Sequence, residues 1–130
     1  MGKSFLIDSN ILSKQLKDQL SKKGSQLFED IIANGNAYVS FVNRIELLSW
    51  KVDKSMERLI SIFLKNEQEY PINEKVIEKT IAIRRNYKIK LPDAIIAATC
   101  LANKMVLLTD NEQDFNKIKG LKTLNPTKDF

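Results

Sequence analysis

The chain has 130 residues, with 21 Lys and Arg against 16 Asp and Glu, a net charge of +5 and no histidine. This length supports one hydrophobic core and is too short for two, so we expect a single domain over residues 1–130. The lack of histidine excludes Ser–His and Cys–His catalysis and zinc sites of the Cys/His type, which leaves carboxylates, lysines, hydroxyls and oxygen-bound metals for any chemistry.

The first half of the chain alternates between predicted strands and helices. Residues 4–7 are a short apolar run typical of a buried strand, and residues 11–20 and 25–33 have the apolar spacing of one or two amphipathic helices. A second strand is expected at residues 37–41. A helix is expected to follow it without a loop, at residues 42–50.

The second half continues the same alternation. Helical spacing resumes at residues 54–64 and again at residues 73–87, where Asn73 is the expected cap. Between these helices, residues 70–72 predict a weak strand, and Pro71 favours the edge of a sheet because proline cannot donate a ladder hydrogen bond. The remaining predicted elements are a helix at residues 92–103, a strand at 105–109 and a last short strand at 121–124.

This alternation predicts an α/β fold of three layers, in which helices cover both faces of a mostly parallel sheet of four or five strands. In such sheets, ligands bind beyond the carboxyl ends of the strands. Asp8 directly follows the first predicted strand and Asp110 directly follows the fourth. Both acids therefore stand where a functional site is expected.

Four acids stand where predicted elements begin or end: Asp8, Glu46, Asp93 and Asp114. Each also has an ordinary interpretation as a helix cap or a first-turn charge, for example in the capping-box pattern Asn43-x-x-Glu46. Asp8 is the hardest to explain in that way, because an unpaired charge at the end of a buried strand is costly without a cation. Converging carboxylates take up protons unless a metal neutralises them, and oxygen ligands select Mg²⁺ or Mn²⁺, with Ca²⁺ a further option.

The charge balance favours a polyanionic partner. Setting those four acids aside leaves 21 basic against 12 acidic side chains. A basic body around an acidic, metal-neutralised cleft suits an enzyme that acts on phosphodiesters. Candidate phosphate contacts are Arg44, Lys51, Lys54, Arg84, Arg85, Lys88 and Lys90, although most charged helix residues are simply solvated.

Four segments resemble the motifs of PIN-domain ribonucleases, especially the VapC-type toxins of prokaryotic toxin–antitoxin pairs. One such motif is a weak signal, whereas four in the family's order are a strong one. They are Leu6-Ile7-Asp8-Ser9-Asn10-Ile11-Leu12, Asn43-Arg44-Ile45-Glu46-Leu47-Leu48, Leu91-Pro92-Asp93-Ala94-Ile95-Ile96-Ala97-Ala98 and Leu108-Thr109-Asp110-Asn111-Glu112-Gln113-Asp114-Phe115.

The resemblance implies a PIN-like fold and a role for each acid at a Mg²⁺ or Mn²⁺ site. Asp8 and Asp93 would be the principal metal ligands, and Glu46 would complete the site or hold a metal-bound water. Asp114 would be the fourth acid, and it matches the toxin motif better than Asp110 does. Two further candidates are Ser9, which would orient Asp8, and Asn111, which would contact the scissile phosphate or brace the acids, with turn chemistry as the alternative for both.

The resemblance also implies hydrolysis of RNA to products with 5′-phosphate and 3′-hydroxyl ends, an antitoxin partner and a homodimer. Exposed apolar residues near Leu47, Trp50, Met56 and Ile60 are candidates for an interface, with core packing as the alternative. No apolar run approaches the roughly 20 residues of a membrane span and no signal peptide is evident, so we expect a cytoplasmic protein without a membrane partner. Cys100, among Ala and Leu residues, is expected to be core.

Two other classes of function stay open. A non-catalytic RNA-binding or adaptor domain would keep the fold, but it would not need the four acids. A phosphatase with Asp8 as nucleophile is less compatible with the sequence, because that chemistry usually wants a second acid two residues later, where Asn10 stands. Metal-dependent cleavage of RNA would discriminate both from the nuclease.

Overall fold

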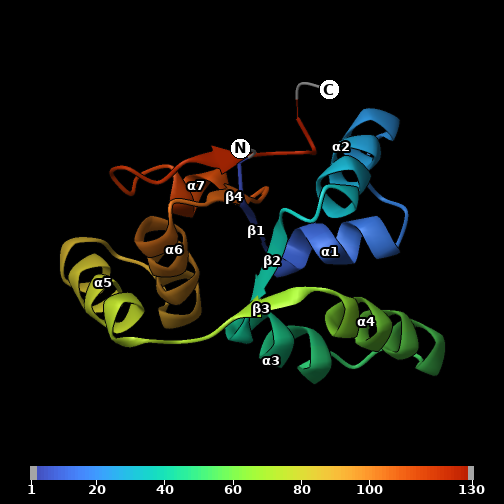
Figure 1. The fold of residues 1–130 in the computed structure, drawn as a ribbon, viewed down its shortest axis with the longest axis horizontal. Coiled ribbons are helices and arrows are strands. Elements are labelled where there is room, and N and C mark those ends of the chain that lie inside the picture. Colours follow the sequence, from blue (N-terminus) through green and yellow to red (C-terminus); the bar gives the residue numbers. More distant parts are fainter. Residues whose placement is uncertain (1–2, 129–130) are drawn as a thin grey trace.

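A five-stranded, fully parallel sheet forms the middle layer of the computed structural model, which describes residues 3–128 (Figure 1). Its strand order is β3-β2-β1-β4-β5, so β1 lies at the centre between β2 and β4. The register pairs Phe5 of β1 with Ala37 of β2 and with Val106 of β4. The strands are β1 (Phe5–Ile7), β2 (Ala37–Ser40), β3 (Gln68–Tyr70), β4 (Val106–Leu108) and β5 (Thr123–Leu124).

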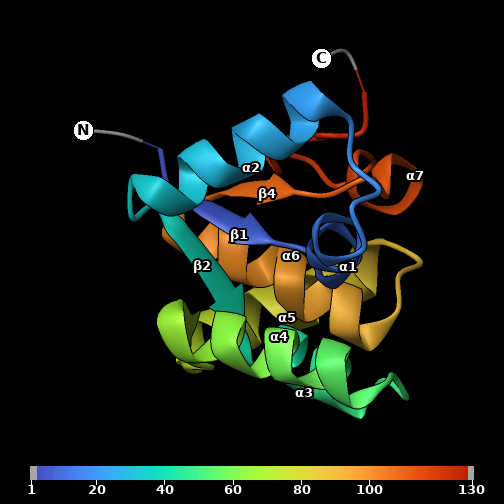
Figure 2. The same cartoon turned by 90° about the vertical axis from the view of Figure 1, so that its right-hand side faces the viewer.

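Helices cover both faces of this sheet, which confirms the expected three-layer α/β/α architecture. Figures 1 and 2 show α5 and α6 on one face, and α1, α2 and α4 on the other. The helices are α1 (Ser9–Leu16), α2 (Lys22–Ala33), α3 (Phe41–Ser49), α4 (Lys54–Asn66), α5 (Glu74–Asn86), α6 (Leu91–Asn103) and α7 (Glu112–Phe115).

Alternation along the two central strands divides the core into two clusters. Leu6 and Leu107 pack with α5 and α6, whereas their neighbours Ile7 and Leu108 pack with α1, α2 and α4. Successive side chains of a strand point to opposite faces, so two adjacent apolar residues are buried only when both faces are covered. The continuous apolar runs in β1 and β4 therefore follow from their central position.

The ends of several elements follow local chemistry. Asn73 caps α5 by accepting a hydrogen bond from the backbone N–H of Val76 at 3.0 Å, as expected. The chain after α2 turns at Gly35, whose φ of +70° is the left-handed conformation that favours glycine. The predicted strand at residues 70–72 is wrong in position, because the observed β3 ends at Tyr70, before Pro71. Its predicted place at the edge of the sheet is confirmed.

Cys100 is buried in the core beside α5, and burial raises the pKa of its thiol far above the usual range, so it is not a reactive nucleophile. Within residues 3–128, no helix has the length and apolar character needed to cross a bilayer.

Candidate active site

Asp8 lies directly after the central strand β1, at the start of α1, and is only 6% exposed. The Thr109 hydroxyl, at the end of the neighbouring strand β4, donates a hydrogen bond of 2.7 Å to Asp8 Oδ2. Burial first, and then the nearby charges of Asp93 and Glu46, raise the pKa of Asp8 from 3.8 to about 6, while this hydrogen bond acts to lower it. The molecule therefore holds a buried carboxyl group that faces two other acids.

The charge of Asp93 interacts with the charges of Asp8, Glu46 and Asp114. Asp93 lies in the first turn of α6 and is half-buried. Its pKa is raised by partial burial first, then by the charges of Glu46 and Asp114, while Lys90 lowers it. The four acids, which are spread over 107 residues of sequence, are thus brought into one region at the carboxyl ends of β1 and β4.

A chain of hydrogen bonds positions Glu46 on α3. The Ser9 hydroxyl donates to Glu46 Oε1 at 2.9 Å, and Asn43 Nδ2 donates to the same hydroxyl at 2.9 Å. Asn43 Oδ1 accepts from the backbone N–H of Ser40 at 2.7 Å. Ser9 was expected to orient Asp8, but its hydroxyl bonds to Glu46 instead.

The fourth acid, Asp114, is braced by Asn111. Asn111 Nδ2 donates to Asp114 Oδ2 at 3.1 Å, and Asn111 Oδ1 accepts from the Asp114 backbone N–H at 3.3 Å. The backbone N–H of Asn111 donates to the Thr109 hydroxyl at 3.0 Å, which links this loop to Asp8. Asn111 therefore acts as the cap of α7 and as a brace for the acid that follows it.

The helix-cap alternatives for Asp8, Glu46 and Asp114 fail in the structure, whereas Asp93 does lie in the first turn of α6, as its alternative interpretation expected. Ser40, not Asn43, caps α3, so Asn43-x-x-Glu46 is not a capping box; the box is formed by Ser40 and Asn43. Asp8 occupies the cap position of α1 but makes no side-chain cap hydrogen bond. Asp114 lies inside α7, where Asn111 is the cap. The carboxylates of Asp8, Glu46 and Asp114 are therefore not used as helix caps and are available to the candidate site.

Asp110 has a different environment from the other four acids. Its carboxylate forms an ion pair with Lys14 of α1. A paired carboxylate is already neutralised by its partner, so it has less need of a cation. This pairing agrees with ranking Asp110 below Asp114.

Residues 5–121 match the family described as PIN domain. The chain belongs to the PIN-domain family. No curated protein matches it closely enough to count as a relative.

Solved structures of toxin–antitoxin complexes share the fold of this PIN domain. A toxin–antitoxin complex from Klebsiella pneumoniae is 27% identical with a TM-score of 0.76, and the match covers 97% of this chain and 100% of that one. VapBC2 from Rickettsia felis, bound to a DNA fragment from its promoter, is 19% identical with a TM-score of 0.79, covering 93% and 97%. VapBC-1 from nontypeable Haemophilus influenzae is 21% identical with a TM-score of 0.76, covering 95% and 98%.

The donor groups of this PIN domain suit a hard divalent cation, because all four are carboxylates. In the part of the chain that the structure describes, no group of three or more Asp, Glu, His or Cys side chains is placed to hold a metal ion. Mg²⁺ commonly uses only one or two carboxylates and keeps several waters. The arrangement therefore fits a hydrated ion held by one or two of the acids better than an ion enclosed by all four.

Two residues of the PIN site were not singled out by sequence reasoning as functional. Thr109 fixes Asp8, and Asn43, which is fully buried, holds Ser9 and the start of α3. The only sequence signal for either is its place within the family motifs. Both act on the acids from elements distant in the chain.

Replacing Asn43 with alanine is expected to lower the free energy of unfolding by about 1–3 kcal/mol, because it leaves the buried Ser40 N–H without an acceptor. It also releases Ser9 from its donor, so any activity that depends on Glu46 should fall about tenfold. Urea denaturation measures the first effect. Asn86→Ala, which removes only an exposed side-chain bond to Ala82, is the matched control and should change the free energy of unfolding by less than about 0.5 kcal/mol. Equal losses of the free energy of unfolding in Asn43→Ala and Asn86→Ala would contradict the role of Asn43 in holding Ser40 and Ser9.

Proposed function

We propose that this PIN domain is a metal-dependent endoribonuclease and the toxin of a toxin–antitoxin pair that acts in the cytoplasm. The observation that carries the proposal is the buried Asp8 carboxyl, whose pKa is raised to about 6 beside Asp93 and Glu46. Such a group destabilises a folded protein unless a cation compensates it. The fold of the toxin–antitoxin structures and the family's general use of divalent metals support the same conclusion.

In this proposal, Asp8 and Asp93 are the direct metal ligands, while Glu46 and Asp114 act through water. A bound divalent ion would activate a water molecule for attack on the phosphodiester and offset the charge that develops on the phosphate. The protein supplies the geometry. Thr109 fixes one oxygen of Asp8, Ser9 one oxygen of Glu46 and Asn111 one oxygen of Asp114.

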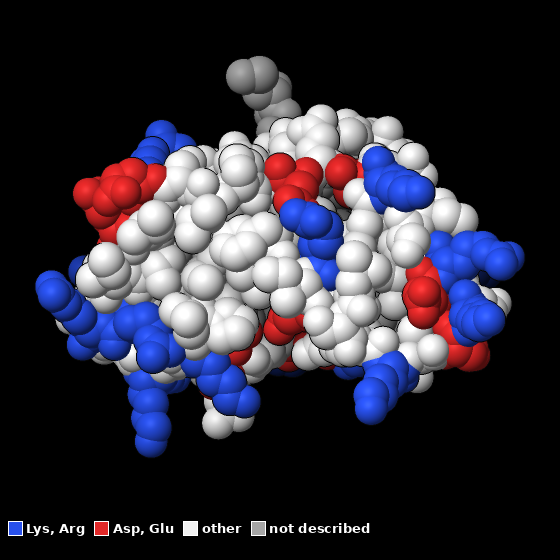
Figure 3. Space-filling view, turned by 90° about the horizontal axis from the view of Figure 1, so that it is seen from below, with Lys and Arg blue, Asp and Glu red and all other residues white. Residues whose placement is uncertain are grey.

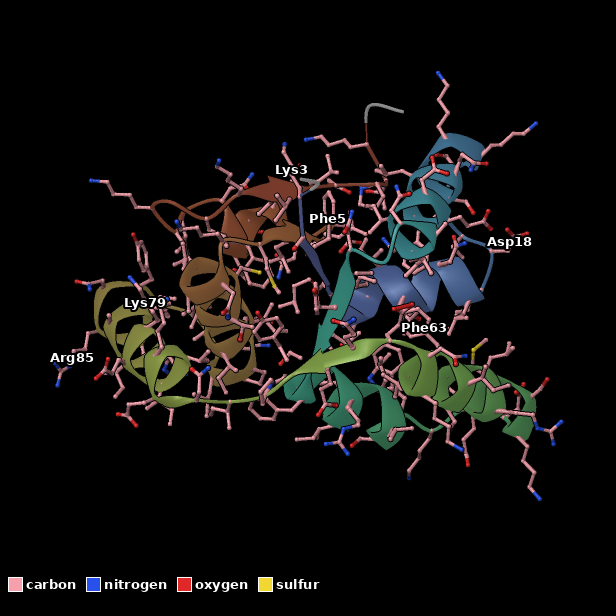
Figure 4. All side chains as sticks on the ribbon, in the orientation of Figure 1. Lys3, Phe5, Asp18, Phe63, Lys79 and Arg85 are labelled. Atoms are coloured by element: carbon pink, nitrogen blue, oxygen red, sulfur yellow. The ribbon has the colours of Figure 1, made fainter. Side chains whose placement is uncertain are left out.

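A basic surface beside the acids supports a nucleic-acid substrate. Lys90 is close enough to Asp93 to lower its pKa, and exposed Arg84, Arg85 and Lys88 precede it at the end of α5. Seen from below, Lys and Arg side chains gather at the lower left of the molecule, below a group of acidic side chains (Figure 3), and Arg85 points outward from the fold (Figure 4). Arg44 is less available as a phosphate contact, because it forms an ion pair with Glu69.

An antitoxin partner and a homodimer are proposed on the same grounds, since the solved relatives are toxin–antitoxin complexes. The interface candidates change, however. Leu47 and Ile60 are core residues, and Trp50 and Met56 are partly buried against the same core cluster. The large apolar residues that α3 and α4 expose are Ile45, Leu48, Leu59 and Ile62.

The nuclease proposal is tested by incubating the purified protein with a panel of structured and single-stranded RNAs. Cleavage is expected with Mg²⁺ or Mn²⁺ and should stop in excess EDTA, then return when metal is added back, because in this proposal the ion lowers the pKa of the attacking water. Gel analysis and mapping of product ends provide the readout, with 5′-phosphate and 3′-hydroxyl ends expected. Cleavage that persists in EDTA would contradict the proposal.

A further inference from the structure

A groove of about 430 Å³ lies between α1 and the turn that joins α3 to α4. It contains no acidic residue, and its polar and apolar groups are mixed. Its lining residues are Asn10, Ser13, Lys17, Trp50, Lys51 and Val52.

The two walls of this groove belong to segments that directly follow two of the acids, Asp8 and Glu46, in the chain. Asn10 follows Asp8 by two residues and is exposed at the start of α1. On the opposite wall, Trp50 follows Glu46 by four residues and stands directly after α3, as its C-terminal cap. Ser13 and Lys17 continue the α1 wall away from Asp8 at the same helical spacing. A substrate bound at Asp8 and Glu46 would thus lie next to the segments that form the groove.

The groove combines an aromatic surface with unpaired positive charge. Trp50 is partly exposed and packs on one side against the core cluster that contains Leu47 and Ile60, which holds the indole in place. Lys17 and Lys51 are exposed, and neither forms an ion pair with another residue in the range 3–128. The nearby Asp53 is engaged in capping α4, where it accepts from the Met56 N–H at 2.8 Å.

We propose that this groove is the binding subsite for the nucleotide next to the scissile phosphate, with its base stacked on Trp50 and its flanking phosphates on Lys17 and Lys51. Aromatic platforms combined with lysines are how proteins hold single-stranded nucleic acid, because every base offers a stacking face once it is unpaired. The substrate expected for this subsite is therefore single-stranded RNA, or RNA with an unpaired loop. The subsite rests on the proposed nuclease function and specifies which form of RNA that site takes.

Trp50 is the only tryptophan in the chain, so its fluorescence reports on the groove alone. A labelled single-stranded RNA oligonucleotide is titrated into the Asp8→Asn protein in EDTA, where it binds without being cut. Tryptophan emission and the anisotropy of the label are followed together. We expect saturable quenching that tracks the anisotropy, and much weaker quenching by a blunt RNA duplex. Binding by anisotropy with unchanged emission, or no binding at all, would overturn the subsite.

Separate substitutions test the contribution of base stacking on Trp50 and the contribution of the lysine charges. Trp50→Leu, which keeps an apolar side chain on the core, is expected to raise the KM for RNA cleavage about tenfold with little change in kcat, whereas Trp50→Phe keeps most of the affinity. The pair Lys17→Ala and Lys51→Ala should weaken binding more than Lys22→Ala and Lys23→Ala, which remove the same charge from α2, outside the groove. Equal effects of the two lysine pairs, or an unchanged KM in Trp50→Leu, would overturn the assignment.

The outcomes for the subsite and for the nuclease are separate. If the wild-type protein cuts RNA with Mg²⁺ but tryptophan emission does not respond, the subsite fails and the nuclease stands. If no RNA in the panel is cut under any metal condition, the nuclease proposal fails, and the subsite fails with it. A groove that is unresponsive to RNA would suit a segment of a protein partner instead.

Discussion

Replacing Asp8 or Asp93 with asparagine is expected to lower the rate of metal-dependent RNA cleavage about a hundredfold or more, since losing even an outer-shell partner of a metal site costs about 10- to 100-fold. Asparagine keeps the shape of each side chain and an acceptor oxygen. The Thr109 hydroxyl that now donates to Asp8 Oδ2 therefore keeps its partner. What disappears is the negative charge that would hold the cation. Initial cleavage rates at saturating Mg²⁺ measure the effect.

Asp18→Asn is the matched control for this experiment, because it makes the same chemical change far from the acids. Asp18 is exposed and has a φ of +57°, a conformation that asparagine tolerates well. Its rate should stay within about twofold of wild type, as expected for a surface substitution. Asp110→Asn is expected to lie between the two, because Asp110 is paired with Lys14. Cleavage by Asp8→Asn at the wild-type rate would show that the acids are not the catalytic centre.

The same Asp8→Asn substitution is expected to stabilise the metal-free protein at pH 7–8. Asp8 is 6% exposed, and its pKa rises from 3.8 to about 6 in the folded state. A shift of that size corresponds to about 3 kcal/mol of destabilisation while the group is ionised. Asparagine removes this charge and keeps an acceptor oxygen for the Thr109 hydroxyl. We expect a net gain of about 1–3 kcal/mol.

The stabilising effect of Asp8→Asn is expected to depend on pH. Between about pH 4 and 6, folded Asp8 binds a proton that the unfolded chain has lost, so the Asp8 contribution to stability falls as the pH rises through this window. Below the window, Asp8 is neutral in both states and its penalty is absent. Urea denaturation in EDTA at several pH values should therefore show the advantage of Asp8→Asn at pH 8 and its loss near pH 4. A destabilised variant at pH 8, with Asp18→Asn unchanged, would contradict the predicted penalty.

The central part of the fold could be predicted from sequence because its physical cause is local. Strands buried on both faces must be apolar at every position, and β1 and β4 show this directly through Leu6-Ile7 and Leu107-Leu108. The edge strand β3 carries no such constraint. Its residues Gln68 and Glu69 are exposed, so the apolar pattern placed the strand too late in the chain.

The candidate site could be predicted only in part. The position of Asp8 at the end of a buried strand already indicated a charge held in the site. The role of Thr109 could not be foreseen, because it depends on β4 lying beside β1, and the two residues are 101 positions apart. Asn43 was assigned to the wrong cap, since α3 begins directly at the end of β2 and Ser40 takes the capping role. Contacts between distant elements are set by topology, which local patterns do not contain.

Binding of Mn²⁺ to the metal-free protein is the most direct test of a cation site built by these acids. Electron paramagnetic resonance of free Mn²⁺ counts the bound ions during a titration of the wild-type, Asp8→Asn, Asp93→Asn and Asp18→Asn proteins. We expect at least one saturable site in the wild type and in Asp18→Asn, displaced by excess Mg²⁺ and lost in the other two variants. Wild-type affinity for Mn²⁺ in both Asp8→Asn and Asp93→Asn would contradict a metal site at the carboxyl ends of β1 and β4.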